Sequence, residues 1–316
     1  MAQRKPDRVY DKLTPTLAFQ LAAPHTWVAA ITPVLFSVCF AALCTTEPLS
    51  LLDAFVLLAP CILMQSAVNV FDDYFDVKRG TDSLENSSED EFDAVLVYNQ
   101  LNPNAVLALG IGYLAAAGLL GAYIVSKAGV FPLVIGIIGA VVVVLYAGGK
   151  TPLSHLPVGE LVSGFVMGML IPFACTYALL GWFNPLVIIT SLPLVMGIGL
   201  INYTNNTCDI EKDTEAHRQT VPVMFGRETA KHVYNLVITA WLILITLIIG
   251  LLYSPGIFVV VIMFIALIPL LRALKANPFV QASRDAAMSQ VVMLNVIANG
   301  LYCAALLASS AITWMF

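Results

Sequence analysis

The residue types best suited to chemistry form two short acidic motifs, and the first of them ends a long apolar run. It reads Asn69-Val-Phe-Asp72-Asp73-Tyr-Phe-Asp76. Residues three and four apart share one face of a helix, so these three carboxylates are expected to crowd together and repel one another. A divalent cation offsets that repulsion, and Mg2+ prefers a few carboxylates combined with the phosphate oxygens of a substrate.

The second motif, Asn205-Asn206-Thr-Cys-Asp209-Ile-Glu-Lys-Asp213, ends another apolar run and repeats the one-turn spacing of carboxylates. Its asparagine amides can donate hydrogen bonds to phosphate oxygens. Two acidic helix ends that face each other match paired metal sites. The sequence therefore predicts a magnesium–diphosphate site. The expected metal ligands are Asp72, Asp76, Asp209 and Asp213, and Asp73 completes the expected catalytic carboxylates.

Each motif also has a simpler interpretation, as a solvated acidic helix end or an acidic cytoplasmic loop. Negative charge at a helix C-terminus is unfavourable because of the helix dipole, so stability alone does not account for the first motif. Acidic groups at membrane depth are also costly and are functional candidates by default. The occurrence of two such motifs favours the functional interpretation.

Basic and aromatic residues near the motifs are candidates for binding substrates. Between the two motifs, the glycines of Tyr146-Ala-Gly-Gly-Lys150 let the backbone approach a ligand closely, although they also suit a turn that ends a helix. Lys150 is a point charge suited to phosphate, and Tyr146 can stack on an aromatic acceptor or stabilise a cation. The expected substrate-binding residues are Asn69, Lys78, Arg79, Tyr146, Lys150, Asn205, Asn206 and Arg218.

Composition indicates a membrane protein. Of the 316 residues, 59% are hydrophobic and 11% are charged, whereas soluble domains carry roughly 25% charged residues. A helix that crosses the bilayer needs ~20 largely apolar residues. Nine runs meet this test: 16–43, 49–71, 104–126, 130–148, 156–180, 185–206, 229–252, 255–274 and 286–313. We therefore expect an all-α, polytopic protein with nine transmembrane helices in a single domain, 1–316. The lack of a basic run argues against a nucleic-acid partner.

The distribution of basic residues predicts the orientation. With nine spans, every Lys and Arg except Lys127 lies on the same side as the N-terminus, and basic residues concentrate in cytoplasmic loops. We therefore expect an integral protein of the cell (inner) membrane, with a polar N-terminal segment 1–15 in the cytoplasm and the C-terminus outside. The two long polar loops, 76–103 and 207–228, each follow an acidic motif, which puts the expected active site on the cytoplasmic side.

Four stretches within about residues 20–310 resemble the UbiA superfamily of intramembrane aromatic prenyltransferases. They are Pro24-His-Thr-x-x-x-x-x-x-Pro33, Asp73-Tyr-Phe-Asp-x-x-x-Gly-x-Asp82, Tyr146-Ala-Gly-Gly-Lys-Thr-Pro-Leu153 with Gly159-Glu160, and Asn205-Asn206-x-x-Asp209-x-x-x-Asp213 running to Thr220-x-Pro-x-x-x-Gly226. The resemblance implies nine membrane helices, Mg2+ as cofactor, and a polyprenyl diphosphate and an aromatic acceptor as substrates. The branch most similar to this sequence prenylates 1,4-dihydroxy-2-naphthoate in menaquinone biosynthesis, with loss of the carboxylate, and forms demethylmenaquinone.

The sequence departs from the superfamily pattern at several positions, one of which is Gly80, where many relatives carry a further Asp. Asp72 stands at the first position of the usual Asn-Asp-x-x-Asp motif, which still allows metal binding and adds charge. Relatives usually have an arginine before the first proline, where this chain has Ala23. They have basic residues near 93–98, where this chain has Asp93, and a glycine near the end of the second motif, where it has His217. These changes bear on diphosphate binding and on the choice of substrate.

Other functions compatible with these residues are prenylation of 4-hydroxybenzoate, homogentisate or haem, and cation-coupled transport. Transporters usually show paired repeats with broken helices and sites at the midplane of the membrane. Here the acidic residues lie at the ends of apolar runs, on one side and beside polar loops. This placement favours an enzyme.

Overall fold

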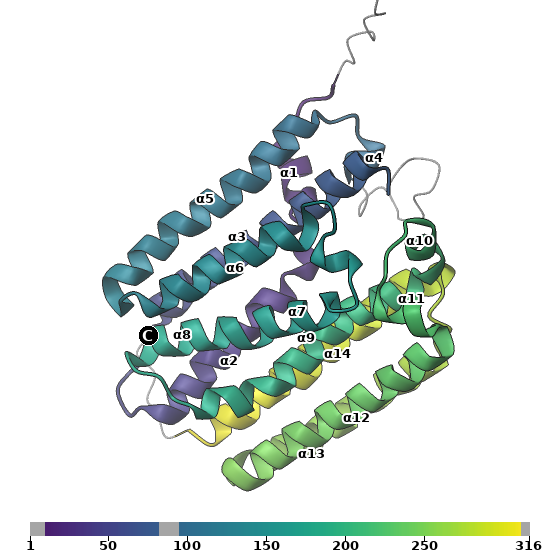
Figure 1. The fold of residues 1–316 in the computed structure, drawn as a ribbon. Helices are drawn as coiled ribbons and strands as arrows, with labels where there is room; N and C mark the ends of the chain where they lie inside the picture. The colour runs from purple at the N-terminus through teal and green to yellow at the C-terminus, as the bar shows by residue number, and fades with distance from the viewer. Residues whose placement is uncertain (1–9, 82–94, 311–316) are drawn as a thin grey trace, which may run out of the picture.

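The computed structural model describes residues 10–81 and 95–310, and the regular structure in these residues is helical apart from isolated bridge positions, among them the pair Asp11 and Leu101. The long helices run side by side as a bundle, and the short helices α4, α10 and α11 lie at one end of it (Figure 1). Much of the predicted segment 1–15 and of the predicted loop 76–103, including Asp82 and Asp93, lies outside the described residues.

The elements follow one another in this order. The first part of the bundle contains α1 (Pro15–Leu21), α2 (Val28–Cys44), α3 (Leu51–Arg79), α4 (Val95–Tyr98), α5 (Pro103–Ala128) and α6 (Phe131–Ala147). The second part contains α7 (Gly159–Phe165), α8 (Ile171–Leu180), α9 (Leu186–Cys208), α10 (Ile210–Glu215), α11 (Val221–Phe225), α12 (Arg227–Leu252), α13 (Ile257–Ala276) and α14 (Arg284–Ala308). Single 3-10 turns cover Pro24–Thr26, Leu153–His155, Ser254–Gly256 and Gln281–Ser283, and a π-helical turn, Val166–Leu170, joins α7 to α8.

Seven helices among the described residues are long and apolar enough to cross a membrane. They are Leu51–Arg79, Pro103–Ala128, Gly159–Leu180, Leu186–Cys208, Arg227–Leu252, Ser254–Ala276 and Gln281–Ala308. An eighth span results if Pro15–Thr26 and Val28–Cys44, which meet at a bend of 58°, count as one. The apolar helix α6 has 17 residues, fewer than the ~20 that a straight span needs. The chain is an integral membrane protein, and the expected count of nine spans is not confirmed.

Helix α3 continues past the end that we predicted for it. The expected apolar run stops at residue 71 and the expected loop begins at residue 76, whereas α3 extends to Arg79 and contains the whole first motif. The spacing of Asp72, Asp73 and Asp76 had already implied helical structure as far as Asp76, whereas the apolar run alone ended earlier. Lys78 and Arg79 in the last turn offset the helix dipole, and Gly80 ends the helix with a φ of 79°. The second expected loop, 207–228, likewise contains α10, α11 and the start of α12.

The largest buried side chains form one core cluster with α9, the helix that leads into the second motif, and they come from helices of both parts of the bundle. Trp241 of α12, Tyr302 of α14 and Phe36 of α2 are completely buried. The Tyr302 hydroxyl donates a hydrogen bond of 2.8 Å to the carbonyl oxygen of Thr190 in α9. This packing holds α9, and with it the second motif, in place against α14.

Two glycines let α7 and the π-helical turn after it lie against the backbone of α9. A Cβ atom on Gly164 would stand 2.5 Å from the carbonyl oxygen of Val195, and one on Gly168 would stand 2.4 Å from the Val195 nitrogen. Packed atoms do not approach so closely, so the contact requires glycine at both positions. The contact sets Glu160, in the first turn of α7, beside the second motif.

Candidate functional site

The two acidic motifs meet at one arginine. Arg218, which follows α10, contacts Asp76 of α3 through Nη2 and lies 3.5 Å from Asp213 of α10 through Nη1. The side chains of Arg218, Asp76 and Asp213 are 12%, 6% and 3% exposed. A buried charge is stable only when it is paired, so the shared guanidinium allows two carboxylates from distant parts of the chain to lie together.

Asp76 has two further basic neighbours. Arg79 Nη1 lies 3.1 Å from Asp76 Oδ1 and donates a hydrogen bond to it. His155 Nε2, from the turn between α6 and α7, lies 3.8 Å from the same oxygen. Positive and titratable groups from three segments therefore surround the last carboxylate of the first motif.

The other end of the second motif is bound by an arginine of α14. Arg284 Nε lies 3.1 Å from Asn205 Oδ1 and 3.1 Å from Asp209 Oδ2. One turn further on, burial raises the pKa of Asp213 to about 7; Arg218 reduces this shift, and the charge of Asp209 adds to it. The Asp213 carboxyl is therefore poised to lose or gain a proton near neutral pH.

A second group of polar side chains joins α6, α7 and α9. Asn206 Nδ2 donates a hydrogen bond of 2.8 Å to Glu160 Oε1, and Asn202, one turn earlier, donates to the hydroxyl of Tyr146. Glu160 is 7% exposed, and its Oε2 atom is buried without a hydrogen-bond partner among the described residues. Burying a carboxylate in this way is costly, which indicates a role beyond that of a favourable charge at a helix start.

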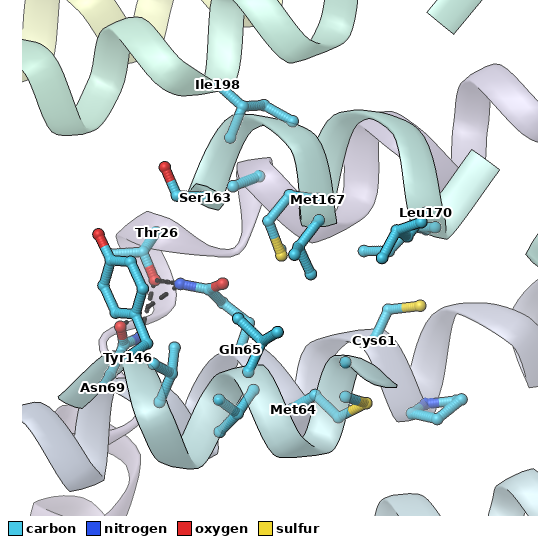
Figure 2. Close-up of a pocket in the computed structure, with 18 of the residues that line it drawn as sticks. Thr26, Cys61, Met64, Gln65, Asn69, Tyr146, Ser163, Met167, Leu170 and Ile198 are labelled. Carbon is cyan, nitrogen blue, oxygen red and sulfur yellow. Dashed lines mark hydrogen bonds between the residues drawn. The ribbon is translucent and has the colours of Figure 1, made fainter. Parts of the chain in front are cut away.

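A cavity of about 750 Å³ lies beside these groups. Its polar lining residues include Asn69, Asp72, Tyr146, Asn205 and Arg284. Elsewhere the lining is largely apolar, and Figure 2 shows Cys61 and Met64 on one side with Met167 and Leu170 on the other. Such a cavity can enclose a long apolar group while its end meets charged residues.

The N-terminal segment helps to shape the polar part of the cavity. Asn69 Nδ2 donates hydrogen bonds to the Thr26 hydroxyl at 2.8 Å and to the Ala22 carbonyl at 3.0 Å. Gln65 Nε2 also donates to the Thr26 hydroxyl, at 3.2 Å (Figure 2). Asn69 thus ties α3 to the turn that precedes α2.

Some predicted site residues lie away from the cavity. Asp73 is half-buried and does not line the cavity, in contrast to Asp72. Lys78 is exposed, and its Nζ atom donates a hydrogen bond of 3.2 Å to the Tyr74 hydroxyl. Lys150 is also exposed and makes no hydrogen bond or ion pair within residues 10–81 and 95–310.

The glycine turn before Lys150 is closely approached by an arginine. Arg79 Nη2 donates hydrogen bonds to the carbonyl oxygens of Ala147, at 2.5 Å, and Gly149, at 3.2 Å. The Gly149 backbone has a φ of 91°, which favours glycine. The turn therefore holds Arg79, and through it Asp76, in position.

The carboxylate oxygens of these groups suit magnesium chemically. Within the part of the chain that the structure describes, no three His, Cys, Asp or Glu side chains are grouped so that they could hold a metal. The carboxylates of the two motifs are hard oxygen donors beside Arg218 and Arg284. Mg2+ commonly binds one or two carboxylates together with substrate phosphates, so the residues fit an ion shared between protein and diphosphate.

The sequence did not point to three members of the site, Arg284, Asn202 and His155. Asn202 could have been found, because it lies one turn before Asn206 and therefore on the same face of the helix. Arg284 was counted only as a basic residue on the N-terminal side of the membrane. Its contact with Asp209 depends on the packing of α14 against α9, which no local pattern reveals.

Comparisons with known proteins all identify relatives from one family. Residues 30–312 match the profile of the UbiA prenyltransferase family. The 1,4-dihydroxy-2-naphthoate octaprenyltransferase of Bacillus subtilis is 32% identical over 214 residues, which cover 68% of this chain and 67% of that protein. UbiA prenyltransferase domain-containing protein 1 of Danio rerio is 26% identical over 219 residues, which cover 68% of this chain and 63% of that protein.

A solved structure shows a similar fold. The structure of a UbiA homologue from Archaeoglobus fulgidus bound to GPP and Mg2+ has a TM-score of 0.64 with this chain at 17% identity. The alignment covers 92% of this chain and 99% of that chain. The arrangement of helices is therefore the one found in that homologue.

Proposed function

Because the chain belongs to the UbiA prenyltransferase family, we propose that it transfers a polyprenyl group from polyprenyl diphosphate to 1,4-dihydroxy-2-naphthoate. The acceptor loses its carboxylate in this reaction, and the product is a demethylmenaquinone. The similarity to the Bacillus subtilis octaprenyltransferase supports this choice of acceptor. The observation that carries the proposal is the meeting of the two acidic motifs at Arg218, next to a large and mostly apolar cavity.

The proposal also includes a location and a topology. The protein would cross the cell (inner) membrane nine times, with its N-terminus in the cytoplasm and its C-terminus outside. The bent pair of α1 and α2 and the short α6 would supply the two spans beyond the seven. Helices α10 and α11 lie at one end of the bundle (Figure 1). Arg79, Arg218 and Arg284 adjoin the acidic motifs at that end, in agreement with a cytoplasmic site.

In this proposal Asp72, Asp76, Asp209 and Asp213 are the metal ligands, and each Mg2+ ion would be shared between one or two of these carboxylates and the diphosphate. Asp73 would add negative charge beside them. The bound ion would neutralise charge on the leaving diphosphate. Arg218 and Arg79 belong to the same group of charges and would donate hydrogen bonds to the diphosphate oxygens. Lys78 and Lys150, both exposed, would contribute long-range attraction for the anionic donor.

The cavity would hold the isoprenoid chain and keep water from the allylic carbon as the bond to diphosphate breaks. Tyr146 lies at its polar part, where the face of the phenol ring can stabilise positive charge. Asn202 fixes the Tyr146 hydroxyl. Asn205, which contacts Arg284, and Asn206, which donates to Glu160, are the proposed substrate-binding amides in the last turn of α9. The acceptor ring would lie between Tyr146 and the allylic carbon.

The direct test supplies membranes containing the protein with a prenyl diphosphate and 1,4-dihydroxy-2-naphthoate, with and without a chelator. We expect a prenylated, decarboxylated naphthoquinol to form only when Mg2+ is present. A parallel panel with 4-hydroxybenzoate and homogentisate identifies the acceptor. Transfer to one of these compounds in preference to the naphthoate would overturn the acceptor assignment, and transfer that persists in the chelator would overturn the metal role.

A further inference from the structure

We propose that Arg284 is a diphosphate-binding residue, so that α14 supplies a third wall of the donor site beside the two acidic motifs. The inference rests on the proposed prenyl transfer and extends it. Arg284 is the first residue of α14 and is remote in sequence from both motifs. Its guanidinium nevertheless reaches Asp209 and Asn205 with distances of 3.1 Å from Nε to each.

The position of Arg284 exposes it to a ligand in the cavity. Its side chain is 14% exposed, and it lines the same cavity as Asp72 and Asn205. Residues further along α14, Met288 and Val292, continue this lining. The charged end of the cavity is therefore bounded by α3, α9 and α14, with the arginine on the α14 side.

The guanidinium has the right chemistry for a diphosphate. The contacts of Nε with Asn205 and Asp209 hold the planar group in one orientation. A guanidinium carries five N–H donors in a rigid fork that matches phosphate geometry. Pre-orientation of this fork lowers the entropy lost when a phosphate binds. Asp209 thus has two roles, as an expected metal ligand and as the group that orients Arg284.

Charge balance supports the same conclusion. Each aspartate of the second motif is accompanied by its own arginine, Asp213 by Arg218 and Asp209 by Arg284. A diphosphate that approaches this site meets buried negative charge, which must be offset for binding to be favourable. The two arginines provide that compensation on both sides of the motif.

In the transfer step, the bond between the allylic carbon and the diphosphate oxygen breaks, and both electrons stay on the oxygen. A pair of electrons from the acceptor ring forms the new carbon–carbon bond, and the acceptor carboxylate leaves as CO2 while its electron pair returns to the ring. Arg284 acts on the first change only, by donating hydrogen bonds to the diphosphate. Its loss should therefore affect the donor and spare the acceptor.

The test uses the purified full chain with Arg284→Gln and Arg284→Lys. The matched control is Arg272→Gln, an exposed arginine of the adjacent helix α13. We expect Arg284→Gln to weaken the binding of inorganic pyrophosphate with Mg2+ by about tenfold to a hundredfold, as for loss of a charged hydrogen bond. The KM for the prenyl diphosphate should rise by a similar factor while the KM for the acceptor stays unchanged. Arg284→Lys should restore part of the affinity, and the control should behave as the unaltered chain.

A second comparison tests whether Arg284 binds the diphosphate itself or only neutralises the charge of Asp209. In an Asp209→Asn background the carboxylate is uncharged, so an arginine that only neutralised it would have no further effect. We expect Arg284→Gln in that background to weaken the residual, metal-free binding of pyrophosphate by about tenfold. Unchanged affinity there, or an unchanged donor KM in the single variants, overturns the inference. An unaltered chain that binds no pyrophosphate and transfers no prenyl group overturns the proposed function itself.

Discussion

Replacing Arg218 by methionine tests whether the two motifs share one cation. The substitution keeps the length and much of the apolar surface of the side chain but removes the guanidinium that contacts Asp76 and lies 3.5 Å from Asp213. Both carboxylates then remain buried, with side chains 6% and 3% exposed. Breaking a buried ion pair by removing one partner costs about 3–5 kcal/mol.

The surroundings place the expected loss at the lower end of that range. Asp76 keeps Arg79 at 3.1 Å, and Asp213 can take up a proton, because burial raises its pKa to about 7. A loss of about 3 kcal/mol lowers the Tm by roughly 6–12 °C in a chain of this size. The folded-state pKa of Asp213 exceeds its ordinary value of 3.8. The folded form therefore binds more protons than the unfolded form between these values, and stability falls as the pH rises through them.

The assay is thermal unfolding of the purified protein in detergent at pH 6 and pH 8. The control is Lys231→Met, which removes a largely exposed pair with Glu228 at 3.3 Å and should cost under about 1 kcal/mol. We expect Arg218→Met to unfold at a lower temperature than the control at both pH values, with the larger difference at pH 8. If the two variants unfold together at pH 8, Asp76 and Asp213 do not depend on a common guanidinium.

Three further predictions follow from the same geometry. Asp76→Asn should lower prenyl transfer at least about a hundredfold while the chain stays folded, measured with a labelled donor; near-normal turnover would remove Asp76 from the site. The affinity for Mg2+ with pyrophosphate should rise from pH 6 to pH 8 more steeply in the unaltered chain than in Asp213→Asn, because Asp213 must release its proton to bind a metal. Gly168→Ala should cost about 1–3 kcal/mol, because its Cβ would stand 2.4 Å from the Val195 backbone, whereas Gly112→Ala, in open space, should cost little. Equal unfolding temperatures would contradict the packing of the π-helical turn Val166–Leu170 on α9.

Hydrophobic patterning was sufficient for the class of fold and for most of the long helices. The seven helices long enough to span coincide with expected runs, because apolar segments of that length have few alternatives in a membrane. The length of α3 was underestimated, because the pattern turns polar at Asn69 while backbone hydrogen bonds and Gly80 decide where the helix ends. The bend between α1 and α2 was not apparent from hydrophobicity, because residues 16–43 form one continuous apolar run.

The candidate site was only partly accessible from the sequence. The spacing of Asp209 and Asp213 could be interpreted from the sequence, because it corresponds to one helical turn. The departure at His217 also has a structural basis: its φ of 56° lies in the left-handed region, where glycine carries no steric penalty. By contrast, the contacts of Arg284 and Glu160 are tertiary, and they depend on how α14 and α7 pack against α9.

The central claim is that both acidic motifs bind one diphosphate and its metal. Calorimetric titration of Mg2+ and pyrophosphate into the unaltered chain, Asp76→Asn, Asp209→Asn and the double variant tests this most directly. We expect one pyrophosphate per chain, a large loss of affinity in each single variant, and little further loss in the double variant, because residues that hold one ligand are not additive. Two independent sites, or losses that add in full, would contradict the account.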